Sequence, residues 1–428
     1  MKTLNGLVAA TAVASIALTG CGTNGVTTSA KTGQSGYRLF AVDMRREGAP
    51  ISVLDAASGR VERSLPLGTP SPDWSRLYAL THDKQRTTVQ AVDTHTGKVA
   101  SHVSFDGWFD LPIASPTGQT GGLSPNGQWL VLQGSGEAKQ TSFMLVVTAF
   151  NQAPRRIVLP GDLSFDAVSN DGSRLYLIES LAKTQPGHYR VRRYDVATGS
   201  LNPTIIVDKR EILSASMTGT RISGVSAPDG SWQYSLYINE KTGPFIHALS
   251  LDQTFAWCID LPAGGTQQEQ VMWSLAITAD GSHLFAVNPA LGKVARVDIT
   301  GDGPSNEISQ VASFTPPVRQ QSQASALFTD ALAKGVQIGS AAVAPDGKTL
   351  IAIADAGTIA IELPSLKPIR TLFSDEGVES VVMSDDGAKL FASSWSGSTL
   401  LEIDPTTGKA LATLHLTTTY VLYRAQRR

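Results

Sequence analysis

Apolar and polar residues alternate over short stretches along most of this chain, which is the pattern of half-buried β-strands. The stretch Lys293-Val294-Ala295-Arg296-Val297-Asp298 alternates in this way, whereas Thr349-Leu350-Ile351-Ala352-Ile353-Ala354 is apolar almost throughout. A continuously apolar strand is expected to be buried on both faces, between neighbouring sheets. Apolar residues have helical spacing only at residues 322–334. The pattern therefore predicts an all-β fold with at most one helix.

One short phrase recurs seven times: a small or polar pair of residues, then Asp-Gly or a close variant, then a strand. Asp-Gly and Asn-Gly accept positive φ angles and so form tight turns between strands. The copies begin at residues 71, 124, 169, 227, 278, 344 and 384. A second turn, Asp-x-x-Thr-Gly or Ser-Gly, follows a later strand at residues 55, 93, 195 and 404. Regular repetition of turns predicts a repeat architecture.

The repeated unit contains four strands, which predicts the blades of a β-propeller. Eight sets of second, third and fourth strands begin near residues 37, 76, 128, 173, 231, 282, 348 and 388. The set at residue 37 has no first strand before it, and residues 419–424 form an orphan strand at the other end of the chain. That strand would complete the first blade, close the ring and leave no open sheet edge. Eight blades are favoured, and seven remain the alternative if the set at residue 37 or 231 is not a blade.

The repeats resemble those of a known class of bacterial propellers. Pro-Asp-Gly-Lys-x-Leu at residues 345–350 and Asp-x-x-Thr-Gly-Lys at residues 404–409 are similar to YVTN and cytochrome-D1-like repeats, with some similarity to the TolB type. The Trp-Asp and Gly-His signatures of WD40 blades do not recur in the repeats. The resemblance covers nearly all of residues 37–428 and implies one propeller domain there. It implies little about activity, because the repeated residues make turns.

Residues 1–20 have the form of an export signal, with Lys2 followed by an apolar run from Leu7 to Ala17. The run ends in Leu18-Thr19-Gly20-Cys21, which resembles the lipobox of bacterial lipoproteins. The resemblance implies cleavage before Cys21, acylation of that cysteine (palmitate included) and attachment to the extracytoplasmic side of the cell membrane or outer membrane. The alternative is a secretory signal with a chance cysteine. In the lipoprotein interpretation, residues 21–36 are the lipidated cysteine and a flexible tether.

Charge and cysteine content limit the partners of this chain. The formal net charge of the 428 residues is −2, so bulk attraction to nucleic acid or acidic lipid is not expected. With Cys21 acylated, Cys258 has no disulfide partner, and its apolar surroundings predict a small core residue. We expect a monomeric domain whose only membrane contact is the lipid.

The two ends of the blades differ in their connections. First-to-second and third-to-fourth connections share one face of a propeller, here called the turn face, and nearly all of them are tight turns. The opposite, loop face carries the more varied connections at residues 44–50, 82–88, 105–121, 134–140, 180–189, 208–221 and 315–337. Binding residues concentrate on irregular loops held by a rigid scaffold. We therefore expect the binding surface on the loop face, although neutral insertions would give the same pattern.

Several residues of the loop face are candidates for binding. Trp108 and Phe109 are large apolar residues in a polar loop, so they are either anchors for a protein or a sugar, or a plug between blades. Cationic loop residues could bind an anion or could be solvated charges; they are Arg45, Arg46, Arg86 and Arg319. His188 and Tyr189 are further candidates and are expected at the surface.

Motifs for catalysis, cofactors and metals were sought in the sequence. A Gly-x-Ser-x-Gly elbow and a Cys-x-x-Cys-His haem site are absent. The Asp-x-x-Thr-Gly-Lys turns resemble those of quinoprotein dehydrogenases, but Val99 and Ala410 stand where a docking Trp is expected. Residues 298–303 resemble the start of a calcium loop, but Ser309 replaces the final Glu. No cofactor or metal is therefore expected.

These observations favour an extracytoplasmic, non-catalytic binding or scaffold module for a protein, a peptide or an envelope glycan. The alternative is a propeller enzyme of the lactonase or lyase kind, whose acidic, His and Arg residues would gather at the channel mouth. A third possibility is a scaffold resembling the outer-membrane proteins that organise complexes.

Overall fold

The computed structural model shows the chain as a series of antiparallel β-sheets. The described residues are 36–43, 48–112, 121–137, 140–181, 187–206, 216–239, 241–317, 341–354, 357–372, 378–394, 399–407 and 409–428. Contacts group residues 32–428 into one compact unit, apart from residues 1–31. Several predicted features lie outside the described residues: Cys21, Arg45, Arg46, Arg319 and the helix at residues 322–334.

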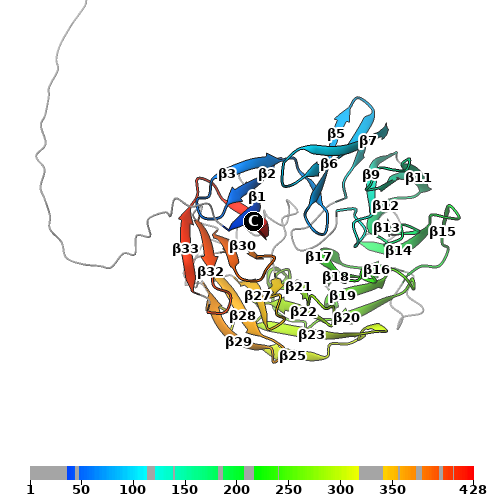
Figure 1. Ribbon diagram of the computed structural model, residues 1–428. Helices are drawn as coiled ribbons and strands as arrows, with labels where there is room; N and C mark the ends of the chain where they lie inside the picture. The colour runs from blue at the N-terminus through cyan, green and yellow to red at the C-terminus, as the bar shows by residue number, and fades with distance from the viewer. Residues whose placement is uncertain are drawn as a thin grey trace, which may run out of the picture. The chain divides into compact units, whose positions relative to one another are not determined.

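Eight antiparallel sheets follow one another around a ring within the described residues (Figure 1). Each has four strands, consecutive in the chain in every blade but the first, and two blades carry one further short strand, so the prediction of eight blades is confirmed and the alternative of seven is wrong. The second strands begin close to the residues expected from the sequence. In the first five blades they begin at Tyr37, Arg76, Trp129, Arg174 and Trp232.

The strands are described by their position in the blade, from blade 1 to blade 8. The innermost strands are β34 (Tyr420–Arg427), β4 (Gly68–Pro70), β8 (Phe109–Asp110), β12 (Leu163–Val168), β17 (Thr220–Ser226), β21 (Ser274–Ile277), β26 (Ala341–Val343) and β30 (Val378–Met383). The second strands are β1 (Tyr37–Asp43), β5 (Arg76–Asp83), β9 (Trp129–Glu137), β13 (Arg174–Ser180), β18 (Trp232–Asn239), β22 (His283–Asn288), β27 (Thr349–Ala354) and β31 (Leu390–Ser394).

The outer half of each blade is built from the third and fourth strands. The third strands are β2 (Ile51–Asp55), β6 (Arg86–Asp93), β10 (Gln140–Val147), β14 (His188–Asp195), β19 (Gly243–Ser250), β23 (Lys293–Thr300), β28 (Gly357–Glu362) and β32 (Thr399–Ile403). The fourth are β3 (Val61–Leu65), β7 (Val99–Asp106), β11 (Arg155–Pro160), β15 (Ser200–Leu201), β20 (Ala256–Asp260), β24 (Gly303–Pro304), β29 (Lys367–Leu372) and β33 (Ala410–His415). Two short additions are β16 (Met217–Thr218) in blade 4 and β25 (Gln310–Ser313) in blade 6.

The C-terminal strand closes the ring, as predicted. β34 pairs antiparallel with β1 from Tyr37↔Arg427 to Asp43↔Tyr420, and it becomes the innermost strand of blade 1. Figure 1 shows the C-terminus beside β1. Because β34 pairs with β1, the first blade is built from both ends of the chain, and the inner edge of β1 is not left unpaired.

The core lies between adjacent blades. Ile351 and Ala360 of blade 7 pack with Leu390 and Ala392 of blade 8 in one buried cluster. β27 is buried on both faces from Leu350 to Ile353, which confirms the expectation from its continuous apolar run. Helix is almost absent: the described residues include α1 (Gln267–Gln270), which a Thr-x-x-Glu capping box begins.

Candidate functional site

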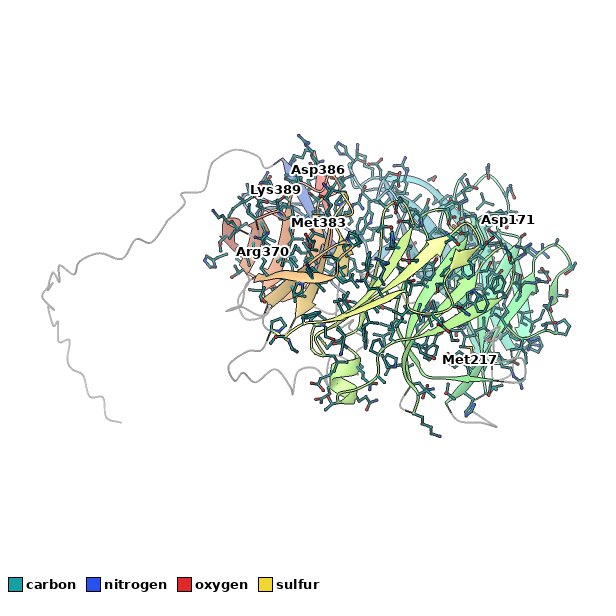
Figure 2. All side chains as sticks on the ribbon, turned by 90° about the horizontal axis from the view of Figure 1, so that it is seen from below. Asp171, Met217, Arg370, Met383, Asp386 and Lys389 are labelled. Carbon is teal, nitrogen blue, oxygen red and sulfur yellow. The ribbon has the colours of Figure 1, made fainter. Side chains whose placement is uncertain are left out.

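The repeated aspartates lie on the turn face and bond within their own turns. Asp171 Oδ1 accepts the Ser169 hydroxyl at 2.6 Å and the Ser173 N–H at 3.0 Å. Burial alone would raise the pKa of Asp171, but these hydrogen bonds hold it below its ordinary value. In Figure 2, Asp171 and Asp386 lie along one edge of the ring and Met217 lies toward the opposite edge. The repeated turns are therefore structural, and the loop face is the opposite one.

Two connections of the loop face are hairpins. β5 and β6 continue to pair as far as Asp83↔Arg86, with Lys84 at a φ of 52° in the turn. β9 and β10 likewise pair as far as Gln140↔Glu137. Residues 82–88 are therefore a tight hairpin and their interpretation as an irregular loop is wrong, because the ladder hydrogen bonds continue almost to the tip. In the connection of residues 134–140 the pairing shifts register between Gln140 and Ser142, and residues 138–139 lie outside the described residues.

The connection from β7 to β8 carries Trp108, and a buried threonine holds this connection in place. The Thr87 hydroxyl donates to the Gly107 carbonyl at 2.7 Å and accepts the Phe109 N–H at 3.0 Å. In the next blade Thr141 makes the same pair of hydrogen bonds, at 2.9 and 3.0 Å. Both threonines are the second residue of a third strand. None of the motifs described above marks this arrangement, although a Thr at that position and a Gly before the next inner strand would indicate it.

Trp108 is exposed but well held. Its side chain is 49% exposed, and its ring stacks on that of His82 with a centroid distance of 4.1 Å and an interplanar angle of 9°. Its Nε1–H donates to Asp110 Oδ2 at 3.2 Å. His82 Nε2 lies 2.8 Å from the Phe109 carbonyl oxygen. Because a carbonyl oxygen only accepts, His82 carries a proton on Nε2 and is itself held in one orientation.

Phe109 is part of the core. It is 1% exposed, and its ring meets that of Phe105 edge-on at 5.6 Å, while the guanidinium of Arg156 lies 5.6 Å from its centroid. Gly134 on β9 makes room for the ring, since a Cβ there would lie 3.1 Å from it. The two interpretations of this pair therefore apply to one residue each: Phe109 packs as a plug, and Trp108 is exposed on the loop face. Binding by Trp108 stays a prediction.

Arg86 is the one cationic candidate within the described residues. It begins β6, it is exposed, and it stands opposite Asp106 in the β6–β7 register. It thus lies at the end of blade 2 that also carries the connection with Trp108. Anion binding by Arg86, Arg45, Arg46 and Arg319 stays a prediction.

His188 and Tyr189 begin β14 in blade 4. His188 is half-buried, with Nδ1 2.9 Å from the Ser216 hydroxyl. Tyr189 is only 7% exposed and stacks on Tyr237 of blade 5, with ring centroids 5.5 Å apart at 16°. The expected surface position of Tyr189 is therefore wrong, because its ring fills the interface between two blades.

A set of polar side chains lines this same interface between blades 4 and 5. We call it the polar seam; its members are Asp166, Arg221, Tyr189, Tyr237, His247 and Cys258. Asp166 on β12 and Arg221 on β17 form an ion pair with Oδ1 and Nη1 2.7 Å apart, and the Asp166 side chain is 2% exposed. Both residues lie on innermost strands, and no sequence motif marks them. A buried carboxylate of this kind requires its cationic partner.

The outer part of the polar seam joins a thiol and an imidazole. His247 Nδ1 on β19 lies 3.7 Å from Cys258 Sγ on β20, and His247 is 1% exposed. Cys258 is half-buried, so it is less enclosed than expected for a core residue. Burial raises the pKa of Tyr189 and Tyr237 well above the ordinary value, so both phenols are neutral at physiological pH.

Metal sites and membrane helices were sought in the part of the chain that the structure describes. No group of three or more His, Cys, Asp or Glu side chains there could hold a metal ion. The stretch that resembles a calcium loop is a tight hairpin in which Thr300 pairs with Gly303, and Asp298 Oδ1 forms an ion pair with Arg296 Nε, 2.8 Å away. None of the described helices has the length and apolar character needed to cross a membrane.

A cavity of about 390 Å³ lies on the turn face between blades 7 and 8. Its lining includes the carboxylates of Asp346, Glu362 and Asp386. Asp386 Oδ2 already accepts the Tyr37 hydroxyl at 3.0 Å, and Glu362 Oε2 accepts the Ser365 hydroxyl at 2.7 Å. These carboxylates therefore have structural partners.

Comparison with known proteins supports the fold. The apo structure of AztD from Citrobacter koseri aligns with a TM-score of 0.52 and 13% identity, covering 91% of this chain and 97% of AztD. Dihydro-heme d1 dehydrogenase NirN in complex with DHE aligns with a TM-score of 0.51 and 14% identity, covering 91% of this chain and 75% of NirN. No family model matches the sequence, and no curated protein does. At such low identities the likeness shows a shared propeller fold alone, in agreement with the resemblance seen in the repeats.

Proposed function

We propose that this chain is a lipid-anchored, extracytoplasmic β-propeller that acts as a non-catalytic binding or scaffold module through its loop face. Its ligand would be a protein, a peptide or an envelope glycan. The observation that carries the proposal is Trp108, a large aromatic side chain that is 49% exposed and nevertheless stacked and hydrogen-bonded in place. Exposed, rigid aromatic residues lose little conformational entropy on binding and are enriched at binding hot spots.

The lipid anchor is supported by the signal-like residues 1–20 and by the Leu-Thr-Gly-Cys sequence ending at Cys21. A single protein ring on a tether would hold its loop face free to meet partners at the membrane surface.

Crosslinking and pull-down from the membrane fraction test the binding proposal. Removing residues 105–121 would also remove β8 and the buried Phe109, so a point substitution is the sharper variant. Trp108→Ala should lose the captured partner, whereas Val158→Ala, which truncates an equally exposed apolar side chain on the outer strand β11, should keep it. Equal capture of proteins by wild type and Trp108→Ala, together with equal binding of envelope glycans, would refute the proposal.

The polar seam favours a second candidate, an enzyme of the lactonase or lyase kind. Four ionisable or phenolic groups gather between blades 4 and 5 on the side of the loop face: Asp166, Arg221, Tyr189 and Tyr237. Clusters of this kind occur at catalytic sites, but they also occur as structural networks. Turnover of a panel of lactones by wild type, lost in Tyr189→Phe with an unchanged melting temperature, would support the enzyme.

A further inference from the structure

Within the part of the chain that the structure describes, Trp108 is the one large exposed apolar side chain of its surroundings. The other large apolar side chains that are exposed within the described residues lie mainly on fourth strands, among them Val99, Val158 and Leu411. Around Trp108 the exposed residues are polar or charged; they are Thr81, Asp83, Lys84, Gln85, Arg86, Asp106 and Asp110. An interface for a folded protein has an apolar centre formed by several side chains. A single aromatic ring with a hydrophilic border does not match such a protein interface.

The indole of Trp108 offers one flat face. His82 covers the other, at 4.1 Å and nearly parallel, and His82 is in turn held by the Phe109 carbonyl at 2.8 Å. The Thr87 hydroxyl fixes the backbone on both sides of Trp108 through Gly107 and Phe109. The ring is therefore positioned before any ligand arrives, which reduces the entropy lost on binding.

A carboxylate stands at the edge of this face. Asp110 Oδ2 accepts the Trp108 Nε1–H at 3.2 Å, Asp110 Oδ1 lies 3.6 Å from His82 Nε2, and the Asp110 side chain is 61% exposed. A carboxylate has about four lone-pair positions, so Asp110 can still accept hydrogen bonds from ligand hydroxyls. An apolar platform beside an open acceptor matches a sugar ring, which has a face of C–H groups and a border of hydroxyls.

The charges around the platform nearly cancel. Lys84 and Arg86 at the β5–β6 tip stand beside Asp83, Asp106 and Asp110, all of them exposed. A strongly charged ligand would find both attraction and repulsion there. The surroundings therefore favour an uncharged ligand over an anionic one.

We propose that Trp108 and Asp110 form a binding site for a neutral saccharide, in which one sugar ring stacks on the open face of the indole and donates a hydroxyl to the carboxylate. This inference rests on the proposed binding function and specifies its ligand class. Because the indole face holds one sugar ring, the bound sugar would be one residue of a longer glycan that continues along the loop face.

Titration of the full-length chain with neutral β-linked glucose and N-acetylglucosamine oligomers tests the site. The dissociation constant is measured by calorimetry or by quenching of tryptophan fluorescence. We expect wild type to bind at least one oligomer, Trp108→Ala to weaken it about tenfold or more, and Trp108→Phe to weaken it less. Asp110→Ala should weaken binding, whereas Val158→Ala should leave it unchanged. Because Trp108 is 49% exposed, its variants should keep the fold, and melting temperatures equal to that of wild type would show this.

The outcomes separate the saccharide from the broader proposal. Binding that is equal in wild type and Trp108→Ala overturns the saccharide site. Capture of a membrane-fraction protein through Trp108, without binding of any oligomer, also overturns it but keeps the proposed binding function. If Trp108→Ala retains both oligomer binding and protein capture at the wild-type level, the saccharide site and the proposed binding function are both overturned.

Discussion

Leu422 on β34 is the residue through which the closure of the ring can be tested. Its side chain is 2% exposed and packs in one buried cluster with Leu39 and Leu54 of blade 1 and Phe391 of blade 8. Its N–H also donates to the Ser380 hydroxyl of blade 8 at 2.7 Å. One side chain of the last strand therefore contacts the first and the last blades together.

Leu422→Ala removes about three carbon atoms from this cluster. At about 0.8 kcal/mol for each buried methylene-sized group, the lost transfer free energy is about 2.4 kcal/mol. The cavity left behind adds to this value, and buried Leu→Ala substitutions lower the free energy of unfolding by about 2–5 kcal/mol in total. A value near the middle of that range is expected here, because strands of two blades hold the cavity walls apart.

Urea unfolding followed by circular dichroism measures the effect. Leu411→Ala is the matched control, because Leu411 is 46% exposed on the outer strand β33 and its truncation should change stability by less than about 0.5 kcal/mol. Equal effects of the two substitutions, or a loss below about 1 kcal/mol for Leu422→Ala, would show that β34 does not hold the ring together.

Four further predictions follow from particular contacts. Arg221→Ala should lower the free energy of unfolding by about 3–5 kcal/mol in urea titrations, because it leaves the Asp166 carboxylate buried without its partner, whereas a loss under 1 kcal/mol would contradict the ion pair. Thr87→Val should lower the free energy of unfolding by about 1–3 kcal/mol in the same assay, since the buried Phe109 N–H loses its acceptor; an unchanged midpoint would count against the role of Thr87 in holding the β7–β8 connection. Hydrogen bonds from Thr278 and from the Ser282 N–H and hydroxyl lower the pKa of Asp280 to about 2, so the contribution of Asp280 to stability is full above about pH 4 and is lost as the pH falls toward 2. The difference in stability between wild type and Asp280→Ala should therefore shrink over that pH range in acid melts, and a constant difference would refute this prediction. Cys21→Ser should move the protein from the membrane to the soluble fraction on immunoblots, and continued membrane association would exclude the lipid anchor.

Much of the fold could be predicted because its signals are local. A turn such as Asp171-Gly172 is specified by residues within the turn: Gly172 adopts a φ of 68°, and Asp171 bonds to Ser169 and Ser173. Counting such turns and noticing the orphan C-terminal strand was enough to predict eight blades and the closure of the ring.

The candidate site was predicted only in part. The sequence placed Trp108 and Phe109 in one connection, but their opposite environments depend on the pairing of Phe109 with Gly134, whose missing side chain admits the ring. The hairpin at residues 82–88 also escaped prediction, since its strands continue through polar residues and depend on the neighbouring strand for their hydrogen bonds.

The sequence by itself determined the repeating unit, the number of blades and the face on which the turns lie, because turns and alternation involve neighbours in the chain. Only the tertiary structure decided which side chains meet between blades. Asp166 and Arg221 are 55 residues apart and belong to different repeats, yet they form an ion pair at 2.7 Å. Innermost strands of adjacent blades come together only when the ring is assembled, so a contact of this kind has no local signal in the sequence.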